Sequence, residues 1–152
     1  MFVKKNISLK SYNTFGIDAK AQFLLEIESD EQLRAAYQSS EFRALPKLVL
    51  GGGSNILFTK NQRKAILKIN IRGIEVLDQK GHEVRVKVGA GEAWHQFVLW
   101  CLDHDFGGVE NLSLIPGTVG AAPIQNIGAY GVELKDVFES LEAYEIKSGK
   151  IR

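Results

Sequence analysis

Two glycine-rich segments carry the residue types in this chain that are best suited to binding chemistry. The first, residues 51–55, reads Gly-Gly-Gly-Ser-Asn and follows the apolar run of residues 48–50, which suits a buried strand. Glycine reaches positive φ at little cost and lets a backbone approach a ligand closely, and successive N–H groups can then converge into a nest that binds an anion. For an isolated glycine triplet, however, we favour the simpler interpretation of a tight turn between two strands.

The second segment, residues 116–131, changes that balance. It has neither helical nor strand periodicity and combines many small residues with apolar anchors. Loops this long in compact domains are usually functional or disordered, and the low charge and the apolar content of this one argue against disorder. Two such loops predict one large ligand that lies extended between them.

Several familiar kinds of site are excluded by spacing. The chain has no G-x-x-x-x-G-K-[ST] motif, and the G-x-G-x-x-G match that starts at Gly51 fails at Ile56, where a strand-like run follows instead of a helix. One cysteine and three separated histidines give no metal-ligand spacing. Ser54 and Ser113 lie in no G-x-S-x-G nucleophile elbow. After these exclusions, the remaining interpretation is that the loops bind an extended, phosphate-bearing cofactor non-covalently.

Composition limits the class of protein. At 152 residues the chain is long enough for one domain with a sizeable core. The formal net charge of +1 gives no electrostatic indication of nucleic acid or of an anionic membrane as a partner. Cys101 is the single cysteine, which excludes an internal disulfide and is typical of a reducing compartment. The sequence has no signal peptide and no apolar run of transmembrane length, so we expect a cytoplasmic protein.

A strand–helix–strand unit is expected to position the first glycine segment. Residues 23–27 have the composition of a strand. Ser29 and Gln32 have the spacing of a capping box, which predicts a helix over residues 31–38. Residues 48–50 form the next strand, so the glycine turn lies at the carboxyl end of the second strand of the unit. Ligands of open α/β sheets bind at such ends.

The remaining sequence predicts a hairpin and a second helix. Residues 74–77 and 83–88 form the two arms of the hairpin, and the second arm alternates valine with charged residues, as a half-buried antiparallel strand does. A helix follows residues 89–91, with His95 and His104 beside its apolar stripe, where a histidine is more often structural than a ligand or base. The residues of that stripe are Trp94, Phe97, Val98, Cys101 and Leu102.

Both ends of the chain are expected to be less regular. Residues 6–15 look like an irregular arm, in which residues 13–16 form either a turn or a lip over a ligand. Residues 137–146 alternate imperfectly, as a strand, and residues 147–150 suit a hairpin turn. Because the chain ends at Arg152, we expect that hairpin to lack its second strand and the sequence to be truncated.

The chain resembles a known enzyme family in the order and spacing of its motifs. Residues 13–16 (Asn-Thr-Phe-Gly), 51–55, 89–92 (Gly-Ala-Gly-Glu) and 110–112 (Glu-Asn-Leu) are similar to UDP-N-acetylmuramate dehydrogenase, also called UDP-N-acetylenolpyruvoylglucosamine reductase. The match over residues 115–131 is long and therefore the most specific. The resemblance extends from about residue 8 over nearly the whole chain.

The resemblance implies an α+β fold, namely a two-lobed FAD-binding domain of the vanillyl-alcohol-oxidase (PCMH) type. A small α/β lobe would cover about residues 18–72, and a larger, mainly antiparallel lobe about residues 73–152, incomplete at its C-terminus and without the substrate domain. FAD would lie non-covalently between the lobes, with its pyrophosphate against residues 51–55 and the other loop along the pyrophosphate and the isoalloxazine. The implied cofactor-binding residues are Gly51, Gly52, Gly53, Ser54, Asn55, Ile115, Pro116, Gly117, Thr118, Gly120, Ala121, Ile124, Gln125, Asn126, Gly128, Ala129 and Tyr130.

The function implied by the resemblance is the NADPH-dependent reduction of enolpyruvyl-UDP-N-acetylglucosamine to UDP-N-acetylmuramate, a step of peptidoglycan synthesis and so of cell-wall biogenesis, cell shape and division. FAD, NADPH and the UDP-sugar would be the partners of the complete protein. The family's catalytic arginine lies in an F-G-Y-R segment, and its serine and glutamate lie farther on. All three would lie beyond Arg152, so no catalytic residue is assigned and the chain alone is expected to be inactive.

Two alternatives stay open. One is a flavin oxidase of the same fold, although such oxidases often attach the flavin through a histidine near the glycine motif, and His82, His95 and His104 do not sit there. The other is a nucleotide-binding or interaction module without chemistry.

Overall fold

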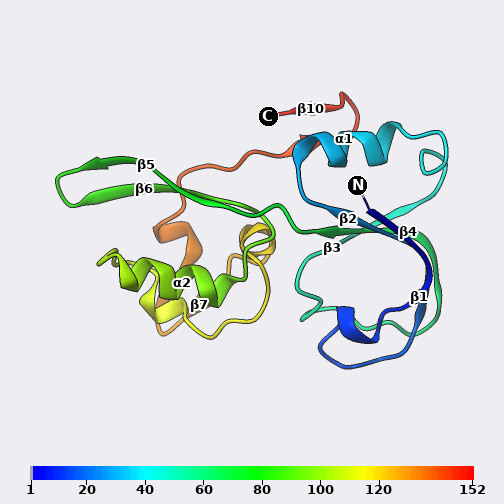
Figure 1. The fold of residues 1–152 in the computed structure, drawn as a ribbon. Helices are drawn as coiled ribbons and strands as arrows, with labels where there is room; N and C mark the ends of the chain where they lie inside the picture. The colour runs from blue at the N-terminus through cyan, green and yellow to red at the C-terminus, as the bar shows by residue number, and fades with distance from the viewer. Residues whose placement is uncertain (1) are drawn as a thin grey trace.

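The computed structural model describes residues 2–152, and its first half is built on a four-stranded sheet with the strand order β1-β2-β4-β3 (Figure 1). Strand β1 runs antiparallel to β2, whereas β2, β4 and β3 are parallel to one another. The parallel strands therefore end at the same edge of the sheet, and residue 51 follows β3 there. The strands are β1 (Phe2–Ser8), β2 (Lys20–Ile27), β3 (Lys47–Leu50) and β4 (Gln62–Ile69).

Helix α1 (Asp30–Gln38) connects β2 to β3, so the predicted strand–helix–strand unit is confirmed. Its capping box is present in a shifted form. Ser29 Oγ accepts from the N–H of Gln32 at 3.3 Å, while Gln32 Oε1 accepts from the N–H of Glu28 at 3.0 Å rather than from that of Ser29. The first bond satisfies an N–H group that the helix hydrogen bonds leave without a partner, and the second ties the helix to the residue before its N-cap.

Apolar residues are buried on both faces of this sheet, because alternate residues of a strand point to opposite sides. Leu24, Leu50 and Ile66 pack with Leu9 on one face. The other face carries Leu25, Ile27, Ala65 and Leu67, which pack with Ala36 of α1 and with Phe42. The small first half of the chain thus has two core layers, and both support the edge from which the glycine segment emerges.

The prediction of an irregular arm over residues 6–15 is wrong for its first part. Residues up to Ser8 belong to β1, which pairs along its length with β2. Two lysines and Asn6 interrupt the apolar alternation of this strand, and Asn6 has a φ of 52°. Pairing with β2 imposes the extended conformation that the local sequence does not indicate.

The second half begins with the predicted hairpin of β5 (Ile74–Lys80) and β6 (Glu83–Val88), in which the valines of β6 are half-buried and the charged residues exposed. Helix α2 (Trp94–Asp103) follows, and its predicted stripe contributes the buried residues Trp94, Val98 and Cys101 to a third core cluster. All strand pairing described after residue 73 is antiparallel. The other elements are short: η1 (Lys10–Tyr12), η2 (Glu110–Leu112), η3 (Val119–Ala121), α3 (Ala122–Gln125), β7 (Gly128–Ala129), β8 (Val132–Glu133), η4 (Leu134–Asp136), β9 (Tyr144–Glu145) and β10 (Lys150–Ile151).

The prediction of a long, unpaired strand over residues 137–146 is also wrong. The strand β9 is confined to Tyr144–Glu145, and it pairs with β10 across the predicted turn. The preceding segment is held to β6 by ion pairs of Arg85 with Glu139 (2.6 Å) and of Lys87 with Glu142 (2.8 Å). The hairpin of β9 and β10 lies beside α1, where the rings of Tyr37 and Tyr144 are 5.1 Å apart (Figure 1).

The two halves meet at the carboxyl end of β4. Gly91 donates its N–H to Ile71 O and Gly89 to Gly73 O, each at 2.8 Å. A Cβ on Gly91 would lie 2.6 Å from Asn70 Cα, so the crossing of the two segments requires glycine there. Two core clusters lie within residues 3–71 and the third within residues 94–134; the lobe boundary near residue 72 stays a proposal. No helix of residues 2–152 is long and apolar enough to cross a membrane.

Candidate functional site

A cleft of about 160 Å³ lies between the glycine loop, residues 51–55, and the second loop, residues 116–131. The two loops approach closely because glycines face each other: a Cβ on Gly52 would lie 3.1 Å from Gly117 Cα. A Cβ on Gly51 would lie 2.7 Å from Thr118 Oγ1. Farther along, Asn55 Nδ2 donates to Gln125 Oε1 at 3.4 Å. The expectation that one site lies between the two loops is therefore consistent with their geometry.

The backbone of the glycine loop offers unused donors. None of the N–H groups of residues 52–55 donates to an acceptor within residues 2–152. The residues that line the cleft include no charged side chain, so no carboxylate competes for these donors. Four successive free N–H groups are the arrangement that binds an anion in a backbone nest.

Two carbonyl groups of the glycine loop, those of Gly51 and Gly53, are held by hydrogen bonds from neighbouring residues. Lys68, near the end of β4, donates from Nζ to Gly51 O at 2.6 Å, and Thr14 donates its N–H to Gly53 O at 3.1 Å. In a trans peptide the C=O and the next N–H point in opposite directions. Anchoring these two carbonyls therefore turns the N–H groups of Gly52 and Ser54 away from the anchors.

The sequence did not indicate the contact of Lys68 with the glycine loop. Burial lowers its pKa, the nearby Arg72 lowers it further, and Glu26 opposes both. A lysine within the apolar run of residues 65–69 was a weak signal of a special role. Its target was hidden, because β4 follows the glycine loop in the sequence but lies beside β3 in the sheet.

Residues 13–16 form a turn behind the glycine loop, and a role of these residues as a lip over the ligand stays a prediction. Asn13 is buried and donates from Nδ2 to Leu9 O (2.7 Å) and Ile17 O (3.0 Å), while its Oδ1 accepts from the N–H of Ile17 (3.0 Å). Gly53, with a φ of 74°, lies against this turn. A Cβ there would overlap the carbonyl oxygen of Tyr12.

The second loop is mounted on residues 90–94. Trp94 donates its N–H to Gly117 O at 3.1 Å, and its indole Nε1 donates to Leu112 O at 2.7 Å. Val119 donates its N–H to Glu92 O at 2.9 Å, and Gly120 donates to Ala90 O at 3.0 Å. The cleft is thus fixed from the sheet on one side and from the start of α2 on the other.

The structure brings most of the predicted site residues together. Those that line the cleft are Gly51, Gly52, Gly53, Ser54, Asn55, Ile115, Pro116, Gly117, Thr118, Ala121 and Gln125. Lining residues that the sequence did not indicate are Val49, Leu50, Ile56, Trp94, Ala122 and Ile127. Most of the latter are apolar residues next to a predicted position.

The other predicted residues lie outside the cleft. Gly120 packs on Ala90, and Asn126, with a φ of 41°, donates from Nδ2 to Glu133 Oε2 at 3.1 Å. Ile124 is 86% exposed and Tyr130 90% exposed. Gly128 and Ala129 form β7. A role of these six residues in binding the cofactor stays a prediction.

The histidines make structural contacts. The Nδ1 atom of His104 lies 2.8 Å from Trp100 O, and the ring stacks on the indole of Trp100 at 4.1 Å. Leu114 donates its N–H to Nδ1 of His95 at 3.2 Å. No histidine lines the cleft, and residues 2–152 contain no cluster of three or more side chains placed to hold a metal ion.

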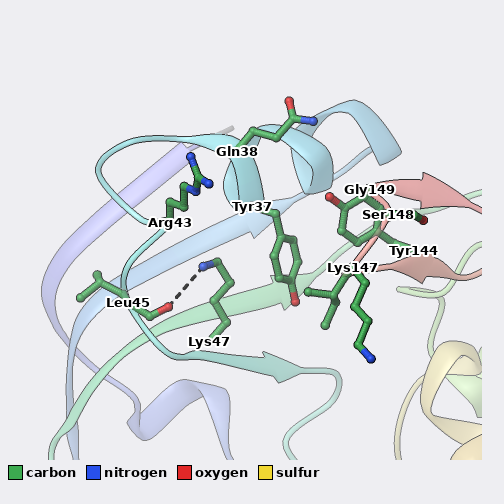
Figure 2. Close-up of a pocket in the computed structure, with 10 residues that line it drawn as sticks. Tyr37, Gln38, Arg43, Leu45, Lys47, Tyr144, Lys147, Ser148 and Gly149 are labelled. Carbon is green, nitrogen blue, oxygen red and sulfur yellow. Dashed lines mark hydrogen bonds between the residues drawn. The ribbon is translucent and has the colours of Figure 1, made fainter.

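A larger hollow of about 640 Å³ lies elsewhere, between the amino end of β3 and the hairpin of β9 and β10 (Figure 2). Its lining includes Arg43, Lys47 and Lys147 but no carboxylate. Lys47 Nζ donates to Phe42 O (2.8 Å) and Leu45 O (3.2 Å), and burial lowers its pKa. Neither glycine-rich loop reaches this hollow, so the cleft remains the candidate site.

Comparisons with known proteins show the family to which the chain belongs. Residues 21–152 match a protein family described as FAD binding domain. The chain is 50% identical over 149 residues to UDP-N-acetylenolpyruvoylglucosamine reductase of Pseudomonas putida, a match that covers 98% of this chain and 44% of that protein. It is 51% identical over 152 residues to the enzyme of the same name from Amoebophilus asiaticus, a match that covers 100% of this chain and 45% of that protein.

The chain also resembles a solved structure of an enzyme of this kind. The crystal structure of UDP-N-acetylenolpyruvylglucosamine reductase from Thermus caldophilus superimposes with a TM-score of 0.77 at 26% identity, over 99% of this chain and 52% of that one. The chain spans less than half the length of the curated relatives named above. The chain belongs to the FAD binding domain family, as its motifs predicted, and the relatives to which it is about 50% identical are UDP-N-acetylenolpyruvoylglucosamine reductases.

Proposed function

We propose that the cleft binds FAD non-covalently, with the diphosphate against the free N–H groups of residues 52–55. The observation that carries this proposal is the row of four N–H donors without a partner among residues 2–152, at the carboxyl end of a parallel sheet and opposite a second glycine-rich loop. Donor groups without a neighbouring carboxylate suit a diphosphate. The glycines also let the two loops approach each other, because a Cβ on Gly51 or Gly52 would press against Thr118 or Gly117 of the second loop.

The size of the cleft indicates which part of FAD it holds. Sites that enclose a drug-sized ligand have volumes of roughly 300–1,000 Å³, whereas this cleft has about 160 Å³. It accommodates the diphosphate and leaves the ring systems outside. We propose that the flavin ring lies along the outer part of the second loop, where Ile124 and Tyr130 are large apolar residues with little cover. The remaining predicted positions Gly120, Asn126, Gly128 and Ala129 belong to the same stretch.

We propose further that the chain is the FAD-binding part of an NADPH-dependent reductase that acts on enolpyruvyl-UDP-N-acetylglucosamine in peptidoglycan synthesis. The names and the identity of its relatives support this assignment. FAD supplies hydride transfer when bound. The chain's own contribution is to bind and orient the cofactor, since the cleft is lined by no Asp, Glu, His, Lys, Cys or Tyr that could move a proton. Protonation of the substrate must therefore come from residues outside the cleft.

The flavin oxidase alternative gains no support from the described residues, because none of the three histidines lines the cleft. A binding module without chemistry is separated from the reductase by turnover rather than by flavin affinity. Net charge and the single, buried cysteine support a cytoplasmic location without nucleic acid or membrane partners.

The proposal is tested by titrating the purified chain with FAD and following the quenching of tryptophan fluorescence, since Trp94 lines the cleft. We expect saturable binding and a change of the flavin absorbance bands. Gly52→Val, whose side chain would meet the backbone of Gly117, should weaken FAD binding by about five- to 150-fold, because a buried overlap of this kind costs about 1–3 kcal/mol.

Gly107→Val is the matched control, because no atom lies within 4 Å of a Cβ at Gly107. The control should bind FAD like the unmodified chain. Equal FAD affinity for Gly52→Val and for the unmodified chain would show that the cofactor does not occupy this cleft.

A further inference from the structure

We propose that His95 is a positioning residue for the FAD cleft, whose Nδ1 holds Leu114 in a left-handed backbone conformation and thereby sets the course of the second loop. The inference rests on the proposed function, since it assigns the residue that shapes one wall of that cleft. His95 does not line the cleft. It acts through the backbone of a neighbouring segment.

The backbone at Leu114 is strained. Its φ is 62°, a conformation that brings Cβ too close to the following carbonyl in any residue other than glycine and is tolerated mainly by asparagine and aspartate. Its side chain is 77% exposed, so burial of the leucine does not compensate. Strain of this kind persists only where the surroundings impose it, and it is concentrated at functional sites.

His95 accepts a hydrogen bond from the backbone of this residue. Leu114 donates its N–H to His95 Nδ1 at 3.2 Å. An accepting Nδ1 requires the neutral imidazole with its proton on Nε2. The next two residues, Ile115 and Pro116, line the cleft, so the left-handed turn at Leu114 decides where the chain enters that wall.

The first turn of α2 holds this segment at three points. Trp94 donates to Leu112 O from its indole and to Gly117 O from its backbone N–H. These two bonds lie on either side of the bond that Leu114 donates to His95. The two tryptophan bonds fix the ends of the segment, but they leave the conformation at Leu114 open. We infer that without the histidine bond Leu114 relaxes to negative φ and moves Ile115 and Pro116 out of place.

Two substitutions separate the hydrogen bond from the bulk of the ring. In His95→Asn the side-chain amide lies near the position of Nδ1 and can still accept from Leu114, whereas in His95→Gln it lies near the position of Nε2. The first readout needs no FAD: the exchange rate of the Leu114 amide hydrogen, measured by NMR. We expect protection in the unmodified chain and in His95→Asn, and exchange at close to the rate of a free amide in His95→Gln.

The second readout is FAD affinity. Loss of one net hydrogen bond corresponds to a change of about three- to tenfold in an equilibrium constant. We therefore expect His95→Gln to bind FAD about three- to tenfold more weakly and His95→Asn to stay within about twofold of the unmodified chain. His104→Gln is the matched control at the C-cap of the same helix. His104 contacts the α2 carbonyl of Trp100 and not the loop, so this substitution should leave FAD affinity unchanged.

A second variant keeps the test informative if His95→Gln folds poorly. Glycine adopts positive φ freely, so adding Leu114→Gly to His95→Gln should recover FAD affinity to within about twofold. Equal losses of FAD affinity in His95→Asn and His95→Gln, or no recovery with Leu114→Gly, would overturn the inference and leave His95 as a packing residue. If the unmodified chain does not bind FAD, the proposed function fails, whereas the exchange of the Leu114 amide still tests the role of His95.

Discussion

Replacing Gly53 by alanine is expected to destabilise the fold itself. Gly52 and Gly53 are neighbours in the glycine loop, but their surroundings differ. The structure separates the two positions. A side chain at Gly52 faces Gly117 across the cleft, whereas one at Gly53 faces the turn at Tyr12 and Asn13 behind the loop.

The expected size of the effect has two parts. Gly53 has a φ of 74°, and a left-handed conformation costs alanine about 1–2 kcal/mol more than glycine, partly offset by the lower entropy of the unfolded chain. A Cβ would in addition overlap the Tyr12 carbonyl, lying 2.9 Å from its carbon and 3.0 Å from Asn13 Cα. Because these atoms belong to the backbone, the turn must move, at a cost of about 1–3 kcal/mol. We expect a total loss of about 3 kcal/mol in the free energy of unfolding.

Gly16 provides a matched control. Its φ of 65° is similar, but no atom lies within 4 Å of a Cβ there. Gly16→Ala therefore carries the conformational cost alone, about 1 kcal/mol. At about 2–4 °C per kcal/mol for a chain of this size, the thermal midpoint measured by far-UV circular dichroism should fall by about 6–12 °C in Gly53→Ala and by about 2–4 °C in Gly16→Ala. Equal shifts in the two variants would refute the argument, because they would mean that the contact with Tyr12 carries no cost.

Three further predictions concern the site and its surroundings. Lys68→Met should weaken FAD binding by about tenfold, because the charged hydrogen bond that orients the glycine loop is lost. Lys64 is an exposed lysine of the same strand, and Lys64→Met should leave FAD binding unchanged. Equal effects of the two substitutions on the dissociation constant of FAD would exclude the orienting role of Lys68. Burial raises the pKa of Cys101 to about 11, so a disulfide reagent at pH 8 should react more than about a hundredfold more slowly than with free cysteine. Because the raised pKa favours the thiol in the folded state, its contribution to stability is complete below about pH 9 and is lost as the pH rises towards 11. The FAD-loaded chain, given NADPH and the enolpyruvyl substrate, should turn over at least about 10²-fold more slowly than the full-length Pseudomonas putida relative, since no acid lines the cleft; a rate within about tenfold would contradict the assignment.

The sequence by itself determined the local structure and the family. Glycines 51–53 predicted a loop because only glycine tolerates positive φ and close approach, and Ser29 and Gln32 predicted the start of α1 through side chains that lie within one turn of their targets. The valines of β6 predicted a half-buried strand by alternation alone. Each of these signals acts over a few residues, so it can be read without knowing the fold.

The shortest elements were not predicted, because they contain too few residues to carry such a local signal. The second loop contains η3 and α3, of three and four residues, and the strands β7 to β10 have two residues each. Such segments are shorter than the stretches over which periodicity can be recognised, about 11–18 residues for a helix and about 4–8 for a strand. Their conformation is imposed by contacts, as β9 is by pairing with β10.

The tertiary structure alone decided which groups support the cleft. Lys68 reaches Gly51 because β4 inserts between β2 and β3, an order that differs from the order of the sequence. His95 meets Leu114 because α2 packs beside the segment before the second loop. These partners are separated by 17 and 19 residues, and residue types and spacing do not encode contacts over such distances. They follow from strand order, register and helix packing, which are settled when the whole chain buries its apolar surface.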